Sequence, residues 1–171
     1  FDVTLSADGK TAFVADGFGG LQIIDVSNPA SPTLTGTFVT SGSARKVTLS
    51  TDGKTAFVAD YESGLQIIDV SNPSSPTLTG TFDTSGSAYG VTLSADGKTA
   101  FVADLESGLQ IIDVSNPASP TLTGTFVTSD FCFDVTLSAD GKTAFVADGF
   151  SGLQIIDVSN PASPTFTGTF N

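Results

Sequence analysis

The stretch Gly20-Leu21-Gln22-Ile23-Ile24-Asp25-Val26-Ser27-Asn28-Pro29 decides the fold, because the chain repeats it without change. The same ten residues return at 64–73, 108–117 and 152–161, so the period is 44 residues. A segment that recurs at a fixed period marks one supersecondary unit copied along the chain. The fold of the whole molecule therefore follows from the fold of one repeat.

Each repeat predicts four short strands and no helix. In the first copy, Val3–Ser6 alternates apolar and polar residues, and Asp8-Gly9 is a strong signal for a hairpin turn. Thr11–Ala15 and Leu21–Val26 are apolar at nearly every position, which is typical of strands buried on both faces. After a turn with two prolines, Thr33–Phe38 alternates as a half-exposed outer strand does.

A single four-stranded sheet of this kind would expose two apolar faces to water. Stacking such sheets radially covers both faces, and this arrangement is the β-propeller. A β-helix is the competing architecture, but its coils are typically shorter. We expect an all-β chain that forms one domain over 1–171, with four-stranded antiparallel blades at 1–39, 45–83, 89–127 and 133–171 joined by short connectors.

The repeated motif resembles a known family. Phe13-Val14-Ala15-Asp16, the stretch at 20–29 and Ser31-Pro32-Thr33-Leu34-Thr35-Gly36-Thr37-Phe38 together look like the LVIVD repeat, and the resemblance covers all four units. It implies a β-propeller of bacterial or archaeal origin, commonly secreted or on the cell surface. That family has no common catalytic residues, so the resemblance implies a fold and an extracellular or cell-surface location but no chemistry.

The number of blades in the complete ring stays open. The chain starts and stops at a blade boundary, so no strand from one terminus completes a blade at the other. We expect half of an eight-bladed ring closed by a homodimer, or part of a longer propeller whose further blades belong to a parent chain. A closed four-bladed monomer is the alternative.

Composition excludes several partners and reactions. The net charge is −12, and four of the six basic residues are the one lysine of the repeated Asp-Gly-Lys turn. Nucleic acid and anionic membranes need a basic face, which this chain lacks, and no apolar run approaches the ~20 residues of a membrane span. With no histidine and a single cysteine, Cys132, zinc sites and Ser-His-Asp catalysis are also excluded.

Two repeated sets of aspartates invite a Ca²⁺ site. One set precedes the loop after the second strand, and the other ends the third strand. No Asp-x-Asp-x-Asp loop occurs, and an aspartate at a strand end usually caps its own turn. We therefore predict structural capping, with no catalytic residue, no metal site and no cofactor, and leave Ca²⁺ binding by the acidic loops open. The sets are Asp16, Asp60, Asp104 and Asp148, and Asp25, Asp69, Asp113 and Asp157.

The copies differ almost only in two connections, the loop between the second and third strands and the connector between blades. In an antiparallel blade with strands in order, both emerge at the same end, while the constant turns emerge at the other. Aromatic residues in such loops suggest a contact surface, although drift in tolerant loops would also produce variation. The predicted binding residues are Phe18, Tyr61, Glu62, Leu105, Glu106, Phe150, Arg45, Tyr89, Phe131 and Phe133.

The favoured function is a non-enzymatic binding or scaffolding module that contacts a protein or glycan through the varied end. Two alternatives remain. The chain could be a self-assembling structural repeat protein, natural or designed, without a ligand. It could also be a fragment of a larger surface protein whose activity lies elsewhere.

Overall fold

The computed structural model describes residues 1–171 and consists of strands and one 3₁₀ turn at Gly149–Ser151. The first blade contains β1 (Asp2–Leu5), β2 (Thr11–Ala15), β3 (Leu21–Asp25) and β4 (Thr33–Phe38). The second contains β5 (Lys46–Leu49), β6 (Thr55–Ala59), β7 (Leu65–Asp69) and β8 (Thr77–Phe82). The third contains β9 (Gly90–Leu93), β10 (Thr99–Ala103), β11 (Leu109–Asp113) and β12 (Thr121–Phe126). The fourth contains β13 (Cys132–Leu137), β14 (Thr143–Asp148), β15 (Leu153–Asp157) and β16 (Thr165–Phe170).

Every blade is an antiparallel meander with its strands in sequence order. The predicted strands are confirmed. In each copy the pairing of the third and fourth strands shifts at the same place, because one residue of the fourth strand, such as Thr35, bulges opposite Ile23 and Ile24. The fourth blade has a further register shift between Cys132 and Asp134. The first turn explains why the chain repeats Asp-Gly-Lys. Asp8 accepts hydrogen bonds from the Ser6 hydroxyl at 2.6 Å and the Lys10 amide at 3.1 Å. Gly9 between them has φ +69°, a conformation that favours glycine.

The core lies between blades rather than inside one. Each of the three gaps holds a cluster of ten buried residues, four from one blade and six from the next. In the middle blades, both faces of the central strands are covered, so Ile67 and Ile68 are each fully buried although they point to opposite sides. The predicted two-sided burial is therefore confirmed where a blade has a neighbour on each side.

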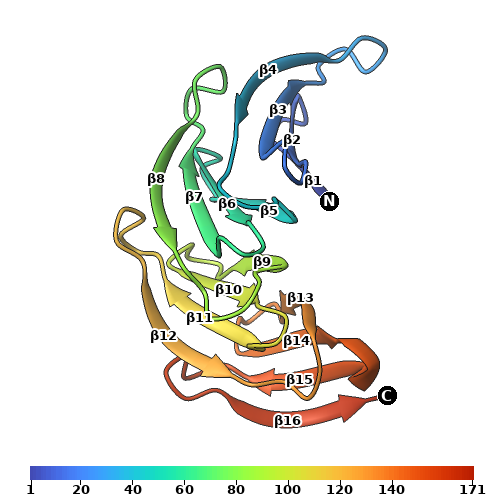
Figure 1. The fold of residues 1–171 in the computed structure, drawn as a ribbon, viewed down its shortest axis with the longest axis vertical. Helices are drawn as coiled ribbons and strands as arrows, with labels where there is room; N and C mark the ends of the chain where they lie inside the picture. The colour runs from blue at the N-terminus through green and yellow to red at the C-terminus, as the bar shows by residue number, and fades with distance from the viewer.

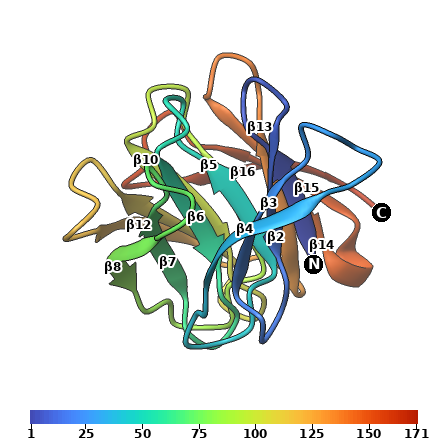
Figure 2. The same ribbon diagram turned by 90° about the horizontal axis from the view of Figure 1, so that it is seen from above.

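The four blades form an open arc (Figure 1). The first strands β1, β5, β9 and β13 lie on the inner side of the arc, and the last strands β4, β8, β12 and β16 lie on the outer side. Seen from above, loops gather at the top and at the bottom of the molecule (Figure 2). The sheets do not close into a ring, so the closed four-bladed alternative is wrong for this structure.

Hydrogen bonds place the connections at two distinct ends. The Val26 amide donates to the Lys10 carbonyl at 2.8 Å, which joins the two constant turns of the first blade at the constant end. At the varied end, Gly17 and Ala44 exchange backbone hydrogen bonds of 3.0 Å, which join the β2–β3 loop to the connector that follows β4. The structure contains no helix with the length and apolar character needed to cross a membrane.

Candidate binding face at the varied end

The varied end is built by loops that the blades hold against one another. In each of the first three blades, the loop between the second and third strands forms a β-bridge with the chain as it enters the next blade. The bridged pairs are Gly17 with Ala44, Tyr61 with Ala88, and Leu105 with Cys132. Because each loop is tied to the neighbouring blade, its side chains are positioned by the packing of the arc. A surface made of separate loops thus becomes one fixed face.

Buried aspartates fix the connectors as well. Asp60 accepts hydrogen bonds from the Thr40 hydroxyl at 2.5 Å and from the Gly42 amide at 2.8 Å. Asp104 makes the equivalent contacts with Thr84 and Gly86. Burial raises the pKa of Asp60, and it raises the pKa of Asp104 to about 6, because a charged carboxylate is poorly solvated there.

The prediction that every repeated aspartate caps its own turn is therefore wrong for Asp60 and Asp104, which bind a connector. It is also wrong for Asp148, which accepts hydrogen bonds from the connector amides of Ser129 and Asp130. It is confirmed for the set that ends the third strands. Asp25 accepts a hydrogen bond from the Ser27 amide at 2.8 Å, and the serine side chain and amide lower the pKa of Asp25. The same bond recurs at Asp69, Asp113 and Asp157.

Arg45 lies at the centre of the varied end. Its guanidinium carbon is 4.8 Å from the ring centre of Tyr61, 5.6 Å from that of Tyr89 and 5.7 Å from that of Phe1. These are cation–π distances, and the rings come from three different repeats. The Nε atom of Arg45 is buried and has no hydrogen-bond partner. The aromatic rings thus hold the guanidinium and leave part of its donor capacity unused.

The aromatic surface continues toward the fourth blade. Tyr89 meets Phe133 edge-on with ring centres 5.4 Å apart, and Phe133 meets Phe131 at 6.3 Å. Phe133 is 39% exposed and Phe131 is 42% exposed, so both rings still face solvent. We name Arg45, Tyr61, Tyr89, Phe131 and Phe133 the aromatic cluster.

Two hollows adjoin Arg45. One of about 280 Å³ lies between Arg45, Tyr89, Phe133 and the N-terminal Phe1. The other, of about 210 Å³, is lined by residues that include Phe18, Tyr61 and Glu62. The guanidinium therefore borders two cavities at the varied end.

An ion pair spans the inside of the arc beside this cluster. Lys46 Nζ lies 2.6 Å from Asp134 Oδ1, which joins the second blade to the fourth. Lys46 follows Arg45, and the two are the only basic residues outside the repeated turn. Lys46 is therefore paired with a carboxylate, whereas its neighbour Arg45 is a cation without a carboxylate partner.

The remaining predicted residues are distributed unequally. Phe18 and Phe150 are 87% and 100% exposed, and they lie on the first and fourth blades. Glu62 and Glu106 are exposed. Leu105 is buried at 8% exposure, so its side chain adds little to the surface.

Tyr61 and Leu105 share an uncommon backbone conformation. Their φ angles are +52° and +33°, and the equivalent positions in the outer blades carry Gly17 at +57° and Gly149 at +48°. A non-glycine residue in this region carries a strain of about 1–2 kcal/mol. Tyr61 keeps this strained position while its ring lies against Arg45.

Sequence reasoning missed Phe1 and the Lys46–Asp134 pair. The repeat itself carries the signal for Phe1, which is the equivalent of Arg45, Tyr89 and Phe133 at steps of 44 residues. These four positions precede the inner strands or lie near their start, and inner strands converge toward the middle of the arc. The ion pair could not be found from one repeat, because it joins two blades that are not neighbours.

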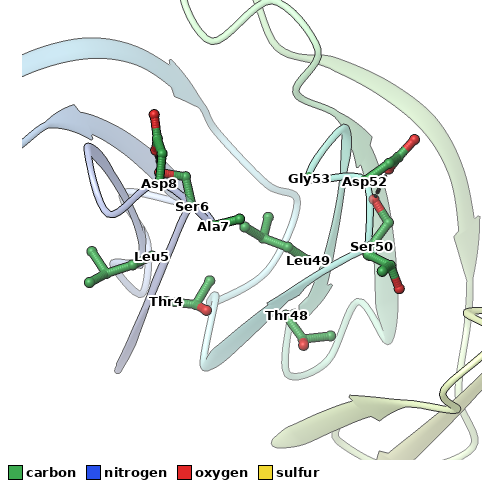
Figure 3. A pocket seen from close by; sticks show the side chains of 11 residues that line it. Thr4, Leu5, Ser6, Ala7, Asp8, Thr48, Leu49, Ser50, Asp52 and Gly53 are labelled. Carbon is green, nitrogen blue, oxygen red and sulfur yellow. Dashed lines mark hydrogen bonds between the residues drawn. The ribbon is translucent and has the colours of Figure 1, made fainter.

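The largest hollow lies elsewhere, at the constant end (Figure 3). It has about 510 Å³ and opens between the hairpin turns of the first two blades, lined by Ser6, Asp8, Ser50 and Asp52 among others. Those carboxylates accept hydrogen bonds from the serines of their own turns. The lining is that of the repeated turn, and Thr51 in place of Ala7 is the one difference between the two turns that form it.

Reactive groups are sparse in the structure. Cys132 is fully buried, and burial raises the pKa of its thiol to about 12, so the thiolate nucleophile is not formed near neutral pH. Cys132 acts as a small buried hydrophobic residue in the third core cluster. No three potential ligand side chains gather where they could hold a metal ion.

Comparisons with solved structures agree with the architecture. A functionally unknown protein from Desulfotomaculum acetoxidans superposes with a TM-score of 0.82 at 20% identity, over 99% of this chain and 55% of that one. The periplasmic gluconolactonase of Pseudomonas aeruginosa gives 0.81 at 19% identity, over 99% and 52%. The β-propeller domain of Myceliophteria thermophila Cps50 (Swd1) gives 0.78 at 13%, over 99% and 57%. At these identities the likeness shows the fold, and the chain spans about half the length of the structures it matches.

No curated protein matches the chain. The model of the LVIVD repeat matches it four times, at residues 3–40, 41–84, 85–128 and 134–171. Four antiparallel four-stranded blades and four repeat matches agree with each other along nearly the whole sequence. The chain therefore belongs to the LVIVD repeat family and has the fold of a β-propeller.

Proposed function

We propose that this protein is a non-enzymatic binding module that contacts a protein partner through the varied end, with Arg45 as the central contact. The observation that carries the proposal is the packing of Arg45 against three aromatic rings, with a buried Nε that has no partner. Arginine and tyrosine dominate the energetic centres of protein–protein interfaces. An extracellular or cell-surface location is part of this proposal, and the resemblance to the LVIVD repeat family supports it.

The chemistry of the partner follows from the charge of Arg45. A guanidinium presents a planar fork of donors that matches a carboxylate. Aromatic rings beside it supply rigid apolar contact area with little loss of side-chain entropy on binding. A partner segment with an aspartate, a glutamate or a C-terminal carboxylate next to an apolar residue fits this arrangement, and the exposed Glu62 and Glu106 at the rim disfavour a long acidic run.

A screen on a random-peptide array and a glycan array tests the proposal. We expect wild-type protein to select peptides that carry a carboxylate beside an apolar residue. Arg45→Gln should lose these peptides by at least tenfold in apparent affinity, since a charge-assisted hydrogen bond contributes about 1.5–3 kcal/mol. Lys54→Gln is the matched control, because it removes one positive charge from an exposed turn at the constant end.

Three results would contradict the proposal. Peptide binding unchanged by Arg45→Gln would separate the function from the cluster. Equal loss in Lys54→Gln would show a nonspecific charge effect. Selection of glycans in place of peptides would replace the protein partner by a carbohydrate.

A further inference from the structure

The arc ends in two apolar sheet faces. In the internal blades, the equivalent faces are covered by a neighbouring blade. On the first blade, the face directed away from the second blade carries Val3, Leu5, Val14 and Ile24, which we name the blade-1 end face. Val3 is 60% exposed and Leu5 is 55% exposed, whereas Val47, the equivalent of Val3 in the second blade, is 2% exposed. Figure 3 shows Leu5 pointing away from the second blade, while its copy Leu49 points toward Ala7 of the first.

The fourth blade has the opposite free face. Phe145, Leu153, Ile155 and Phe170 form the blade-4 end face, and Leu153 and Phe170 are 37% and 75% exposed. The equivalents of Phe145, Leu153 and Ile155 in the other three blades are at most 3% exposed and supply residues to every core cluster. These equivalents are Phe13, Leu21 and Ile23, Phe57, Leu65 and Ile67, and Phe101, Leu109 and Ile111.

The two end faces are the two halves of one repeated interface. Each internal cluster combines residues of the blade-4 type from one blade with residues of the blade-1 type from the next. A blade-4 end face therefore matches a blade-1 end face residue for residue, and it does not match another blade-4 end face. This complementarity specifies a head-to-tail contact.

A glycine in the fourth strand of each blade shows whether a neighbouring blade is present. A Cβ atom on Gly36, Gly80 or Gly124 would collide with the carbonyl oxygen of Pro73, Pro117 or Pro161 in the next blade. A Cβ atom on Gly168, the fourth copy, would meet nothing within 4 Å. By the repeat, the missing neighbour of Gly168 is the carbonyl of a proline equivalent to Pro29.

We propose that a second copy of this chain covers both end faces, so that two arcs form an eight-bladed ring. The blade-4 end face of each copy packs on the blade-1 end face of the other, and Gly168 meets Pro29 of the second copy. The occupant is another copy because the chain carries both complementary faces itself.

Apolar exposure favours the same conclusion. Contiguous apolar patches of more than a few hundred Å² are rare on monomers and mark association sites. A head-to-tail contact closes into a ring when its rotation divides the circle, and otherwise continues into a filament. The proposal thus predicts one defined particle and no series of larger ones.

The mass of the chain in solution tests the proposal. Light scattering coupled to size-exclusion chromatography should give twice the 17.3 kDa of one chain, about 35 kDa. A particle of 17 kDa at every concentration would overturn the proposal. A ladder of higher masses would overturn the closed two-copy ring.

Gly168→Val should block the contact with the second copy and leave the fold of one chain intact, because in a single chain a Cβ atom at this position meets nothing within 4 Å. We expect this variant to run at 17 kDa with an unchanged far-ultraviolet circular dichroism spectrum. Thr167→Val, one residue away on the same strand and exposed, is the control that should stay at 35 kDa. Dimeric Gly168→Val protein would overturn the proposal.

A mixing experiment tests the head-to-tail orientation. Val3→Asp places a charge on the blade-1 end face and should also give 17 kDa, whereas Ser119→Asp, in an exposed turn of the third blade, should not. When Gly168→Val and Val3→Asp proteins are mixed, one of the two contacts is intact, so a 35 kDa species should reappear. If only one of the two variants dissociates, the contact joins like faces and the proposal is wrong.

Discussion

At the scale of single residues, Tyr61 is the position where function and stability oppose each other. Its φ of +52° is one that two of the four copies meet with glycine. We expect Tyr61→Ala to keep the strain and lose the ring, and Tyr61→Gly to lose both. Tyr61→Gly should therefore be more stable than Tyr61→Ala by about 1 kcal/mol. Urea denaturation of both variants measures the difference, and a more stable alanine variant would contradict the assigned strain.

Asp104 gives a pH dependence with a defined sign. Its pKa is raised to about 6 by burial first, and Glu106 and Asp83 nearby add to the shift. The unfolded carboxyl titrates near 3.8, so the folded state binds the proton more tightly. The contribution of this group to stability is largest below about pH 4 and falls as the pH rises through 6.

Asp104→Asn isolates that contribution, because every other carboxylate titrates in both proteins. We expect the stability advantage of wild type over Asp104→Asn to shrink between pH 4 and pH 7. Urea denaturation at a series of pH values measures it. An advantage that grows with pH would show that the hydrogen bonds from Thr84 and Gly86, which favour the ionised form, outweigh burial.

At the scale of strands and blades, one repeat position can be compared in two surroundings. Ile67 is fully buried between the second and third blades, whereas Ile155 is its copy on the blade-4 end face. Ile67→Ala should cost about 2–5 kcal/mol, the usual cost of deleting buried methyl groups. Ile155→Ala should cost less than about 1 kcal/mol in a single arc.

The comparison is made in Val3→Asp protein, which keeps the chain as one arc and leaves Ile155 without a neighbouring blade. Thermal or urea unfolding gives both values. Equal costs at the two positions would mean that the core lies within each blade and that the neighbouring blade adds little. The clusters between blades would then contribute little to the free energy of unfolding.

The strands could be predicted from the sequence because the apolar pattern of each strand indicates which of its faces are buried. Apolar residues at every position of Thr11–Ala15 require two covered faces, and Asp8-Gly9 has few alternatives to a hairpin turn. The aspartates show where local reasoning ends. Asp25 bonds two residues ahead and could be assigned from its turn, whereas Asp60 bonds a threonine 20 residues away in a connector.

At the scale of the whole molecule, the varied end illustrates the same limit. Repeat comparison predicted which residues vary and that their loops share one end. It could not predict that Arg45 gathers rings from three repeats, because this depends on how the inner strands converge. It also could not predict that Leu105 is buried while Phe150 is fully exposed, since both lie in the variable loop between the second and third strands of their blades.

The two proposals concern different surfaces of the open arc, so neither depends on the other. The varied end differs from blade to blade and holds the aromatic cluster, whereas the end faces repeat the internal interface. Gly168→Val should therefore release single arcs that still select the same peptides, because Arg45 lies on the second blade and far along the chain from Gly168. Loss of peptide selection in that variant would show that the binding face needs both copies.

The most direct test of the account is hydrogen–deuterium exchange of the protein with and without a peptide selected on the array. We expect protection of the amides at the varied end, in residues 16–20, 39–46, 60–64 and 83–90. The turns of the constant end, residues 6–10, 26–32, 50–54 and 70–76, should exchange unchanged. Protection of those constant turns, with the varied end unaffected, would contradict the central claim that recognition lies where the repeats differ.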